Sequence, residues 1–456
     1  MIFTQYYLDC LSQASYLVAD EGTGEAVIVD PRRDIAEYLA DAEKQGLTIV
    51  GVINTHFHAD FVSGHLELAE ATGAWIGYGE AADADFEVRK LADGERISLG
   101  DVTLEVMATP GHTPESISVL VYEHADDEIA YGVLTGDALF IGDVGRPDLL
   151  ASVGLTADEL GTMLYDSSQN KLMGLPDAVR VFPAHGAGSA CGKNLSTETQ
   201  STIGEQRRTN YACAPMTEEQ FVAVVTAGQP AAPEYFIYNA TLNKEGRELL
   251  HEVELPAMSC EEVDAALAGG AVIVDARDVQ TFAAGHVVGA LNVPVDGRMA
   301  ETVGMVIDPD RKVVLMAEQG EEQEAAVRLV RIGFDGAIGY VEDPTAYMLE
   351  RQDRVRRASR LEPTAVPDLD LEGIQFLDIR NPGELENGTI PGTTNLPLGQ
   401  LRRRMDELDR DAPVLLHCAG GWRSSVGASL LRANGFTDVS DILGGYAGYE
   451  AAVSRT

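Results

Sequence analysis

A short stretch near the N-terminus carries side chains of the types that bind metal ions. His56, His58 and Asp60 alternate with apolar residues in the sequence Thr-His-Phe-His-Ala-Asp-Phe, which spans residues 55–61. Alternate side chains of an extended segment point to the same side, so the two imidazoles and the carboxylate can converge. Histidine and aspartate are common metal ligands, and the pattern predicts a metal site rather than a solvated turn.

Three later stretches add further candidate ligands. They are residues 109–113 with His112, residues 135–139 with Asp137 and residues 181–186 with His185. Each stretch follows a predicted strand, as the first follows the β-branched run at residues 49–53. A single histidine or aspartate in a loop is usually structural, but four such loops in this order indicate one shared site.

A second kind of chemistry is predicted near the C-terminus. Cys418 opens the sequence Cys-Ala-Gly-Gly-Trp-Arg-Ser-Ser, between a predicted strand at 413–417 and a predicted helix that ends near residue 434. Backbone N–H groups, the positive end of the helix and Arg423 all favour a thiolate there. The other cysteines (Cys10, Cys191, Cys213 and Cys260) form no CxxC pair, so a disulfide framework is not expected.

The elements that must position these residues alternate between strand and helix. Residues 26–31 read as a strand, 35–45 as an amphipathic helix closed by Gly46, and 64–72 as a helix after the first metal stretch. Further short strands are predicted near residue 97, at 102–107 and at 117–122. The fold class is therefore α/β.

The chain repeats itself from about residue 253. The residues Asp275, Arg277, Gly285, Gly289, Asn292 and Pro294 align at one constant offset with Asp378, Arg380, Gly388, Gly392, Asn395 and Pro397. This self-similarity predicts two copies of an α/β domain. We expect domains at residues 1–252, 253–350 and 366–456, with residues 351–367 as the linker between the copies. In the first copy Met316 takes the place of the cysteine and Glu321 that of the arginine, so this copy is predicted to be an inactive scaffold.

Composition limits the partners. The chain has 456 residues and a net charge of −40, which argues against nucleic acid and anionic membrane surfaces. No apolar run approaches the roughly 20 residues that span a bilayer, and the N-terminus lacks the features of a secretion signal. We expect a cytoplasmic protein that forms a homo-oligomer.

The four metal stretches, in their order, resemble the metallo-β-lactamase fold over about residues 1–215. This resemblance implies an αββα sandwich. Hydrolases of that fold, such as glyoxalase II, usually have a second histidine after the aspartate, where this chain has Phe61. A two-metal centre would therefore lack one ligand, and the resemblance points to the persulfide dioxygenase branch.

By that resemblance His56, His112 and Asp137 bind one iron(II) per chain. Two histidines and one carboxylate leave positions open for substrate sulfur and dioxygen. His58, Asp60 and His185 then lie beyond the iron or serve an alternative metal. Two further stretches also look like these enzymes. In them Arg146 and Lys193 are candidates to hold a thiol carrier or are solvated charges, and Cys191 is either a sulfur relay or a plain buried thiol.

The pattern Cys-x-x-Gly-x-Arg-Ser, with Leu-Gly-Gly-Tyr at 443–446, resembles the rhodanese domain, in which the cysteine carries a persulfide sulfur. One departure is Thr389, where that family usually has histidine. The two resemblances together imply a persulfide dioxygenase and rhodanese fusion. It would use dioxygen to oxidise a low-molecular-weight thiol persulfide to sulfite, and Cys418 would transfer sulfur to give thiosulfate. The alternatives are a zinc-dependent thioester hydrolase of the glyoxalase II type and tail domains that serve only for docking.

Overall fold

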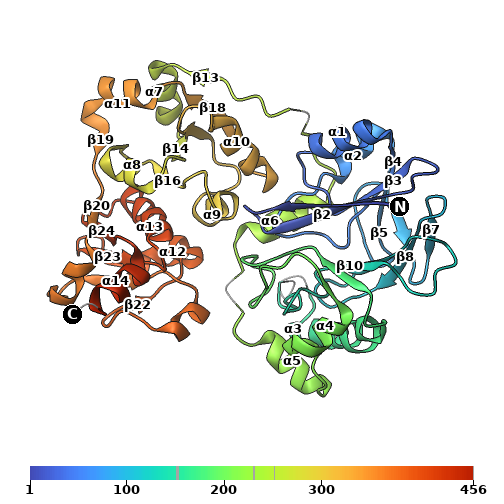
Figure 1. Cartoon of the computed structure of the whole chain (residues 1–456). Coiled ribbons are helices and arrows are strands. Elements are labelled where there is room, and N and C mark those ends of the chain that lie inside the picture. The colour runs from blue at the N-terminus through green and yellow to red at the C-terminus, as the bar shows by residue number, and fades with distance from the viewer. Residues whose placement is uncertain (150–153, 230–231, 251, 455–456) are drawn as a thin grey trace. The chain divides into compact units, whose positions relative to one another are not determined.

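The computed structural model describes residues 1–149, 154–229, 232–250 and 252–454 (Figure 1). The chain divides into two compact units. The first comprises Met1–Ala232 and Phe236–His251, and the second comprises Pro233–Tyr235 and Glu252–Thr456. Within the described ranges, none of the helices has the length and apolar character needed to cross a membrane.

Two mixed six-stranded sheets form the first unit, with strand orders β1-β2-β3-β4-β5-β6 and β12-β11-β10-β9-β8-β7. The first sheet contains β1 (Ile2–Leu8), β2 (Gln13–Ala19), β3 (Glu25–Val29), β4 (Thr48–Ile53), β5 (Trp75–Gly79) and β6 (Arg89–Leu91). The second contains β7 (Arg96–Ser98), β8 (Thr103–Ala108), β9 (Ile117–Tyr122), β10 (Gly132–Gly136), β11 (Arg180–Pro183) and β12 (Ser201–Thr202). Strand β4 is buried at Ile49 and at residues 51–53, as its apolar run predicts, while Thr48 is exposed and Val50 is half-buried.

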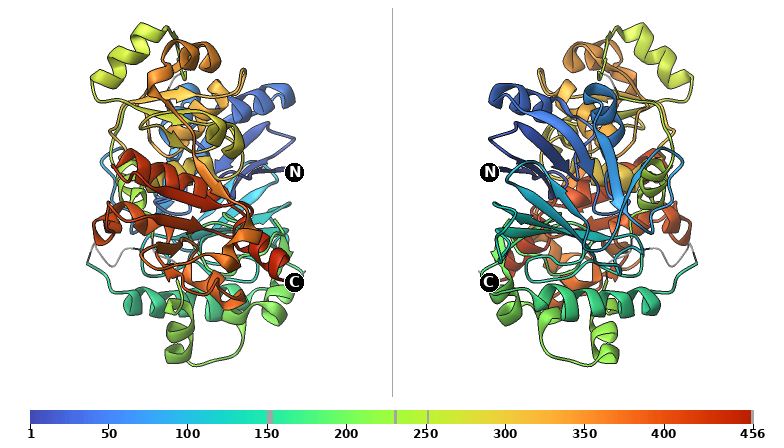
Figure 2. Two further views of the ribbon diagram at one scale, coloured as in Figure 1. Left: turned by 90° about the vertical axis from the view of Figure 1, so that its left-hand side faces the viewer. Right: turned by 90° about the vertical axis from the view of Figure 1, so that its right-hand side faces the viewer.

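The core of this unit lies between the two sheets. Val18 and Ile53 of the first sheet pack in one buried cluster with Leu104, Val119 and Phe182 of the second. The outer faces are covered by helices: α1 (Ala36–Gln45) and α2 (His65–Thr72) on one side, and α3 (Ala157–Tyr165), α4 (Ile203–Thr209) and α5 (Glu218–Thr226) on the other (Figure 2). The predicted αββα sandwich is confirmed. Helix α6 (Tyr235–Lys244) follows α5.

Two parallel five-stranded sheets with the same topology form the second unit. The first has the order β13 (Ala257–Met258), β18 (Ala337–Val341), β17 (Val313–Met316), β14 (Val272–Asp275) and β16 (Leu291–Asn292). The second has the order β20 (Ser359–Leu361), β24 (Val439–Ile442), β23 (Val414–His417), β21 (Gln375–Asp378) and β22 (Thr394–Asn395). Helices of the first copy are α7 (Cys260–Ala268), α8 (Val279–Ala284), α9 (Met299–Val306), α10 (Glu322–Arg331) and α11 (Pro344–Glu350), and those of the second are α12 (Leu398–Arg404), α13 (Trp422–Ala433) and α14 (Gly445–Val453).

The repeated aspartate and arginine make the same contacts in both copies. Arg277 donates from Nε to Asp275 Oδ1 at 2.8 Å and from Nη2 to Asp275 Oδ2 at 2.5 Å. Arg380 makes the corresponding bonds to Asp378 at 3.0 and 2.6 Å. Each arginine also donates to the carbonyl of the repeated glycine, at residue 285 or 388. These residues therefore maintain the common fold of the two copies.

The repeated asparagine of the first copy has an additional role. Asn292 and Asn395 each donate from Nδ2 to two carbonyls of their own copy. Asn292 also accepts a hydrogen bond from Ser425 at 2.9 Å, and its backbone N–H donates to Ser429 at 3.0 Å. Both serines lie on α13 of the second copy, so the first copy is bonded to the helix that follows the cysteine loop.

Strand register corrects one sequence alignment. Asp275 pairs with Met316 in the first copy, and Asp378 pairs with His417 in the second. Met316 therefore corresponds to His417, and Ala317 corresponds to Cys418. The prediction that Met316 and Glu321 stand at the cysteine and arginine positions was wrong by one residue, because sequence spacing does not determine the register of β17 and β23 in their sheets. The first copy still has no thiol at this place.

Residues 351–367 connect the two copies and also form parts of both. β19 (Val355–Arg356) pairs with β15 (His286–Val287) of the first copy, and β20 pairs in parallel with β24 of the second. The expected linker thus supplies an edge strand to the sheet that carries Cys418. The domain boundaries expected from the sequence stay a prediction.

Candidate metal centre and cysteine loop

The four predicted metal stretches meet at one end of the sandwich in the first unit. Each follows the C-terminal end of a strand: the first follows β4, and the others follow β8, β10 and β11. Parallel pairing of β10 with β11 brings their C-terminal ends together. The candidate ligands form two neighbouring buried groups.

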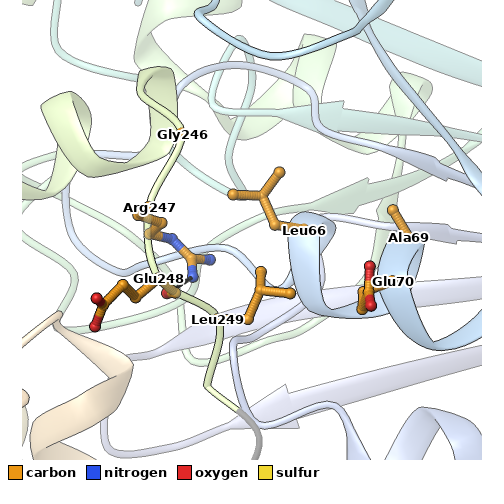
Figure 3. Close-up of a pocket in the computed structure, with 7 residues that line it drawn as sticks. All are labelled: Leu66, Ala69, Glu70, Gly246, Arg247, Glu248 and Leu249. Carbon is orange, nitrogen blue, oxygen red and sulfur yellow. Dashed lines mark hydrogen bonds between the residues drawn. The ribbon is translucent and has the colours of Figure 1, made fainter.

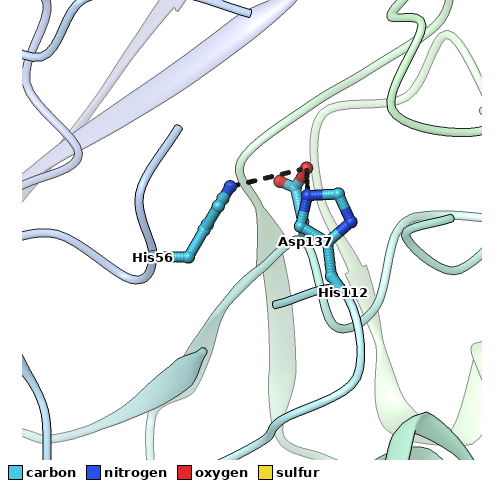
Figure 4. A group of neighbouring side chains, drawn as sticks. All are labelled: His56, His112 and Asp137. Carbon is cyan, nitrogen blue, oxygen red and sulfur yellow. Dashed lines mark ion pairs between the residues drawn. The ribbon is translucent and has the colours of Figure 1, made fainter. Parts of the chain in front are cut away.

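The first group consists of His56, His112 and Asp137 (Figure 4). Both imidazoles turn Nε2 toward Asp137 Oδ2, at 3.9 Å from His56 and 3.3 Å from His112. The His56 and His112 rings are nearly perpendicular. All three side chains are at most 1% exposed, so their neighbours rather than water determine their charges.

The second group consists of His58, Asp60 and His185. His185 Nε2 lies 3.4 Å from Asp60 Oδ2 and 3.6 Å from Asp137 Oδ1, so Asp137 lies between the two groups. The ring of Phe61 packs against that of His58, with centroids 4.4 Å apart. Phe61 therefore fills space beside this group without offering it a ligand atom.

Unpaired buried atoms test whether these residues fit a metal. His56 Nε2, His58 Nδ1, His185 Nε2 and both carboxylate oxygens of Asp60 and of Asp137 have no hydrogen-bond partner among the described residues. Buried polar atoms are normally hydrogen-bonded, since an unsatisfied one costs about 1–3 kcal/mol. A cation between these lone pairs would satisfy them, so the donor set fits a metal ion.

Hydrogen bonds on the far side of each ring select the nitrogen that faces the site. His112 Nδ1 donates to the carbonyl of Arg146 at 2.9 Å, and His185 Nδ1 donates to that of Ser12 at 3.2 Å. Both rings therefore present Nε2 as a lone pair. Partners of this kind fix the tautomer and orientation of metal-binding histidines.

Asp30 is a functional candidate that the sequence interpretation missed. Its Oδ1 accepts from the backbone N–H of Thr55 at 2.7 Å and from His58 Nε2 at 2.9 Å, and its Oδ2 accepts from the Thr55 hydroxyl at 2.9 Å. Thr55 Oγ1 in turn lies 3.0 Å from His56 Nδ1. Because the Thr55 hydroxyl donates its proton to Asp30, its oxygen accepts a hydrogen bond from His56 Nδ1. The available signals were an aspartate at the end of a buried strand and the proline that follows it. The φ of Asp30 is 52°, which is uncommon for a residue other than glycine.

Burial and the neighbouring charges shift the acid–base properties of the site. Burial and the charges of His58 and His112 hold the pKa of His56 well below its usual value, so this ring keeps a free lone pair. Burial works to lower the pKa of His58, but the charge and hydrogen bond of Asp30 outweigh it and raise that pKa.

Cys191 lies beside the metal group. Its sulfur is within 4.8 Å of ligand atoms of Asp137 and His185. Burial, followed by the charges of Asp60 and Asp137, raises the pKa of the Cys191 thiol well above its usual value. The thiol form is therefore favoured at neutral pH, and the predicted role as a sulfur relay stays a prediction.

Arg146 and Lys193 both have partners within the protein. Arg146 is buried, pairs through Nε and Nη2 with Asp148 at 2.7 Å, and donates from its backbone N–H to the carbonyl of Cys191. Lys193 Nζ donates to the carbonyls of Val224 and Ala227 at the end of α5. These contacts hold loops around the site, and the expected binding of a thiol carrier stays a prediction for both residues.

A pocket on the first unit shares no residue with the metal groups. It lies between α2 and the segment after α6, and it is lined by Leu66, Ala69, Glu70, Gly246, Arg247, Glu248 and Leu249 (Figure 3). Beneath it Glu67 accepts hydrogen bonds from Arg247 Nη2 and the backbone N–H of Leu250. This charge pairing attaches the segment to α2.

The cysteine loop lies between β23 and α13 in the second unit. Cys418 is 1% exposed, and its sulfur accepts a hydrogen bond from the backbone N–H of Gly421 at 3.1 Å. Gly445, which has a φ of 55°, packs so closely on the carbonyl of Cys418 that a Cβ there would lie 2.3 Å from it. This close approach explains the glycine at 445, while Gly444 has a φ of 68°, a left-handed conformation that favours glycine.

Arg423 does not act as an isolated positive charge. Its Nη1 and Nη2 donate to the two carboxylate oxygens of Glu384 at 2.7 and 2.6 Å. Burial alone would lower the pKa of Arg423, but the bonds and charge of Glu384 outweigh it and raise that pKa. Arg423 thus remains charged with Glu384 as its partner, which sequence spacing could not reveal.

Comparisons with known proteins agree with this arrangement. The metallo-beta-lactamase superfamily model matches residues 8–185, and the rhodanese-like domain model matches residues 259–347 and 367–452. The mitochondrial persulfide dioxygenase ETHE1 of Bos taurus is 32% identical over 215 residues, which cover 46% of this chain and 75% of that protein. A hydroxyacylglutathione hydrolase of Hyphomonas neptunium is 38% identical over 134 residues, which cover 29% of this chain and 49% of that protein.

A solved structure extends the likeness beyond the first unit. The crystal structure of a metallo-beta-lactamase from Staphylococcus aureus has a TM-score of 0.67 and 33% identity, and the match covers 74% of this chain and 98% of that chain. The predicted order of one metallo-β-lactamase domain followed by two rhodanese-like domains is confirmed. The chain belongs to the persulfide dioxygenase family of the metallo-β-lactamase superfamily, with two rhodanese-like domains joined to it.

Proposed function

We propose that this protein oxidises a low-molecular-weight thiol persulfide with dioxygen at the first metal group and transfers sulfane sulfur through Cys418. The observation that carries the proposal is the buried group of His56, His112 and Asp137, whose inward atoms include three without a hydrogen-bond partner. The family membership supports the substrate class. The occurrence of a rhodanese-like cysteine loop in the same chain supports the transfer step.

The metal is proposed to be iron(II), one per chain, held by His56, His112 and Asp137. When bound, iron supplies open coordination positions at which a persulfide sulfur and dioxygen can react. The overall reaction converts a persulfide RSSH, dioxygen and water to the thiol RSH, sulfite and two protons. The protein holds the two imidazoles in their ligating tautomers through Thr55 and the carbonyl of Arg146.

Cys418 is proposed to carry the sulfur. Its thiolate attacks the outer sulfur of thiosulfate or of a thiol persulfide, which becomes the outer sulfur of a Cys418 persulfide, and sulfite or the carrier thiolate leaves with the electron pair of the broken S–S bond. In the reverse direction sulfite takes the outer sulfur and becomes thiosulfate. The backbone N–H of Gly421 stabilises negative charge on the sulfur.

A second candidate function is zinc-dependent hydrolysis of a thioester. The similarity to a hydroxyacylglutathione hydrolase favours it, together with the unpaired atoms of His58, Asp60 and His185. Phe61 argues against hydrolysis, because this residue stands where such hydrolases have a further histidine. A homo-oligomer and a cytoplasmic location stay predictions from the sequence.

Oxygen uptake distinguishes the two functions. Purified protein loaded with iron(II) is expected to consume dioxygen when given glutathione persulfide or coenzyme A persulfide, and to release sulfite. The measurement uses an oxygen electrode together with metal analysis, and the zinc-loaded protein serves as the control. No oxygen uptake by the iron form, together with rapid thioester hydrolysis by a form that holds two zinc ions, would establish the hydrolase instead.

Replacement of Asp30 by asparagine is expected to weaken metal binding about tenfold to a hundredfold. An amide nitrogen in place of Oδ2 cannot accept from the Thr55 hydroxyl, which is then free to donate to His56 Nδ1 and disturb its tautomer. The dissociation constant is measured by competition with a chelator. Asp41→Asn on α1 removes a carboxylate from the same unit and serves as the control. An affinity equal to that of the control would show that Asp30 does not orient the ligands.

A further inference from the structure

A second guanidinium reaches the cysteine loop from the segment that joins the two copies. Arg360 lies on the edge strand β20, and its side chain is 6% exposed. It donates to both carboxylate oxygens of Asp441 on β24, at 3.0 and 2.8 Å. Its Nη2 also donates to the backbone carbonyl of Gly421 at 2.9 Å. One buried residue from outside the predicted rhodanese domain thus binds the loop that surrounds Cys418.

Both residues that accept hydrogen bonds from Arg360 are connected by further hydrogen bonds to the sulfur of Cys418. Gly421 receives Arg360 at its carbonyl and donates its own N–H to Cys418 Sγ at 3.1 Å. Asp441 also accepts from the hydroxyl of Ser424 at 3.0 Å, and that hydroxyl oxygen lies 3.8 Å from Cys418 Sγ. The two hydrogen-bond partners of the sulfur are therefore both held by the pair of Arg360 and Asp441.

Gly421 makes this support necessary. Its φ of 88° and ψ of −1° place it in the left-handed region, at the residue where α13 begins. A glycine restricts its own backbone less than any other residue, so external bonds must fix the direction of its peptide groups. The bond from Arg360 fixes the carbonyl of Gly421, and so helps to fix the residue whose N–H donates to Cys418.

The other copy shows whether the fold itself requires this pair. Asp441 of β24 lies between two strands: it pairs with Arg360 of β20 on one side and with Leu416 of β23 on the other. In the first copy Tyr340 of β18 has the same position, since it pairs with Ala257 of β13 on one side and with Leu315 of β17 on the other. Alanine and tyrosine thus stand where the second copy has the arginine and the aspartate.

Of two buried ion pairs in the second copy, the first copy has the counterpart of only one. The pair of Asp378 and Arg380 is retained there as Asp275 and Arg277, with the same hydrogen bonds. The Arg360 and Asp441 pair is absent there, as is the cysteine. The fold of a copy can therefore form without the pair, and the pair occurs in the copy that carries the thiol.

We propose that Arg360 and Asp441 are positioning residues for the sulfur of Cys418, which they orient through Gly421 and Ser424. This inference rests on the proposed sulfur transfer by Cys418. The arginine does not touch the sulfur and carries no group in transfer. It determines whether the N–H of Gly421 is in place to stabilise the thiolate and the persulfide. Ser424 donates its hydroxyl proton to Asp441 and therefore presents its oxygen to the Cys418 thiol as an acceptor.

The test removes both charges together, because Arg360→Met alone would leave the buried Asp441 without its partner. The double variant Arg360→Met/Asp441→Asn keeps similar side-chain volumes. Two rates are measured in the full-length protein: alkylation of Cys418 by iodoacetamide across pH, followed by mass spectrometry, and sulfur transfer from thiosulfate to cyanide. We expect each rate at neutral pH to fall about tenfold, with half-maximal alkylation moved to higher pH. Arg360→Lys keeps the charge without the planar fork and should give a smaller loss.

The controls separate positioning from stability. Arg356→Ala removes an exposed arginine of β19, in the same connecting segment, and should leave both rates unchanged. Thermal melting and circular dichroism should show the double variant folded. A folded double variant with unaltered alkylation and transfer would overturn the inference. If the unmutated protein takes no sulfur onto Cys418 while the alkylation profile still shifts in the variant, the proposed function fails and the positioning role stands.

Discussion

Replacement of Asp137 by alanine is expected to remove the bound metal and to lower persulfide-dependent oxygen uptake by roughly a thousandfold or more, since a metal ion contributes several kcal/mol to the reactions it assists. Asp137 supplies the only carboxylate of the first group, and its second oxygen faces His185. Without it two histidines remain, which hold iron(II) weakly. Metal content by atomic spectroscopy and oxygen uptake by electrode measure the two effects.

A carboxylate from the second group is the matched control. Asp60 is buried, with 4% of its surface exposed, and its oxygens have no hydrogen-bond partner among the described residues. If iron is bound by His56, His112 and Asp137 alone, Asp60→Ala should keep about one iron per chain. Loss of the metal from the Asp60 variant to the same extent as from the Asp137 variant would indicate that both groups bind metal, as in a two-metal hydrolase.

Replacement of Cys418 by serine is expected to lower sulfur transfer by at least roughly a thousandfold, because a serine hydroxyl cannot form a persulfide. The metal groups lie in the other unit and are not altered by this change. Oxygen uptake should therefore stay near that of the unmutated protein. Sulfite should accumulate in place of the thiosulfate expected from the unmutated protein, and chromatography of the sulfur anions measures the ratio.

The Cys418 variant also tests whether joining the two units in one chain promotes thiosulfate formation. Under the proposed function, sulfite released in one unit would meet the Cys418 persulfide at a raised effective concentration, because the two units are covalently joined. Cys260→Ser is the control, since Cys260 is the first residue of α7 in the first copy, whereas the cysteine loop belongs to the second copy. Full thiosulfate formation by the Cys418 variant would assign the transfer to Cys191 or to the metal site. A collapse of oxygen uptake would mean that Cys418 supplies sulfur to the first unit.

The sequence by itself determined which local groups converge. His56, His58 and Asp60 lie two residues apart after a buried strand, and this spacing predicted that they contribute to one site. The structure divides them between two neighbouring buried groups. The position of Cys418 between a strand and a helix is equally local, and the repeat was visible from residues at one constant offset. The structure and the comparisons confirm the αββα sandwich and the two rhodanese-like domains. The site roles and domain boundaries stay predictions.

Only the tertiary structure decided which distant residues support these groups. Asp30 reaches His58 because β3 and β4 pair in parallel, and Arg360 reaches the cysteine loop because β20 pairs with β24. Strand register placed Ala317, rather than Met316, at the position of the cysteine. Sheet order and register arise from the packing of the whole core, so short-range spacing carries no information about them. For the same reason the sequence predicted the reactive side chains, whereas the residues that orient them emerged only from the fold.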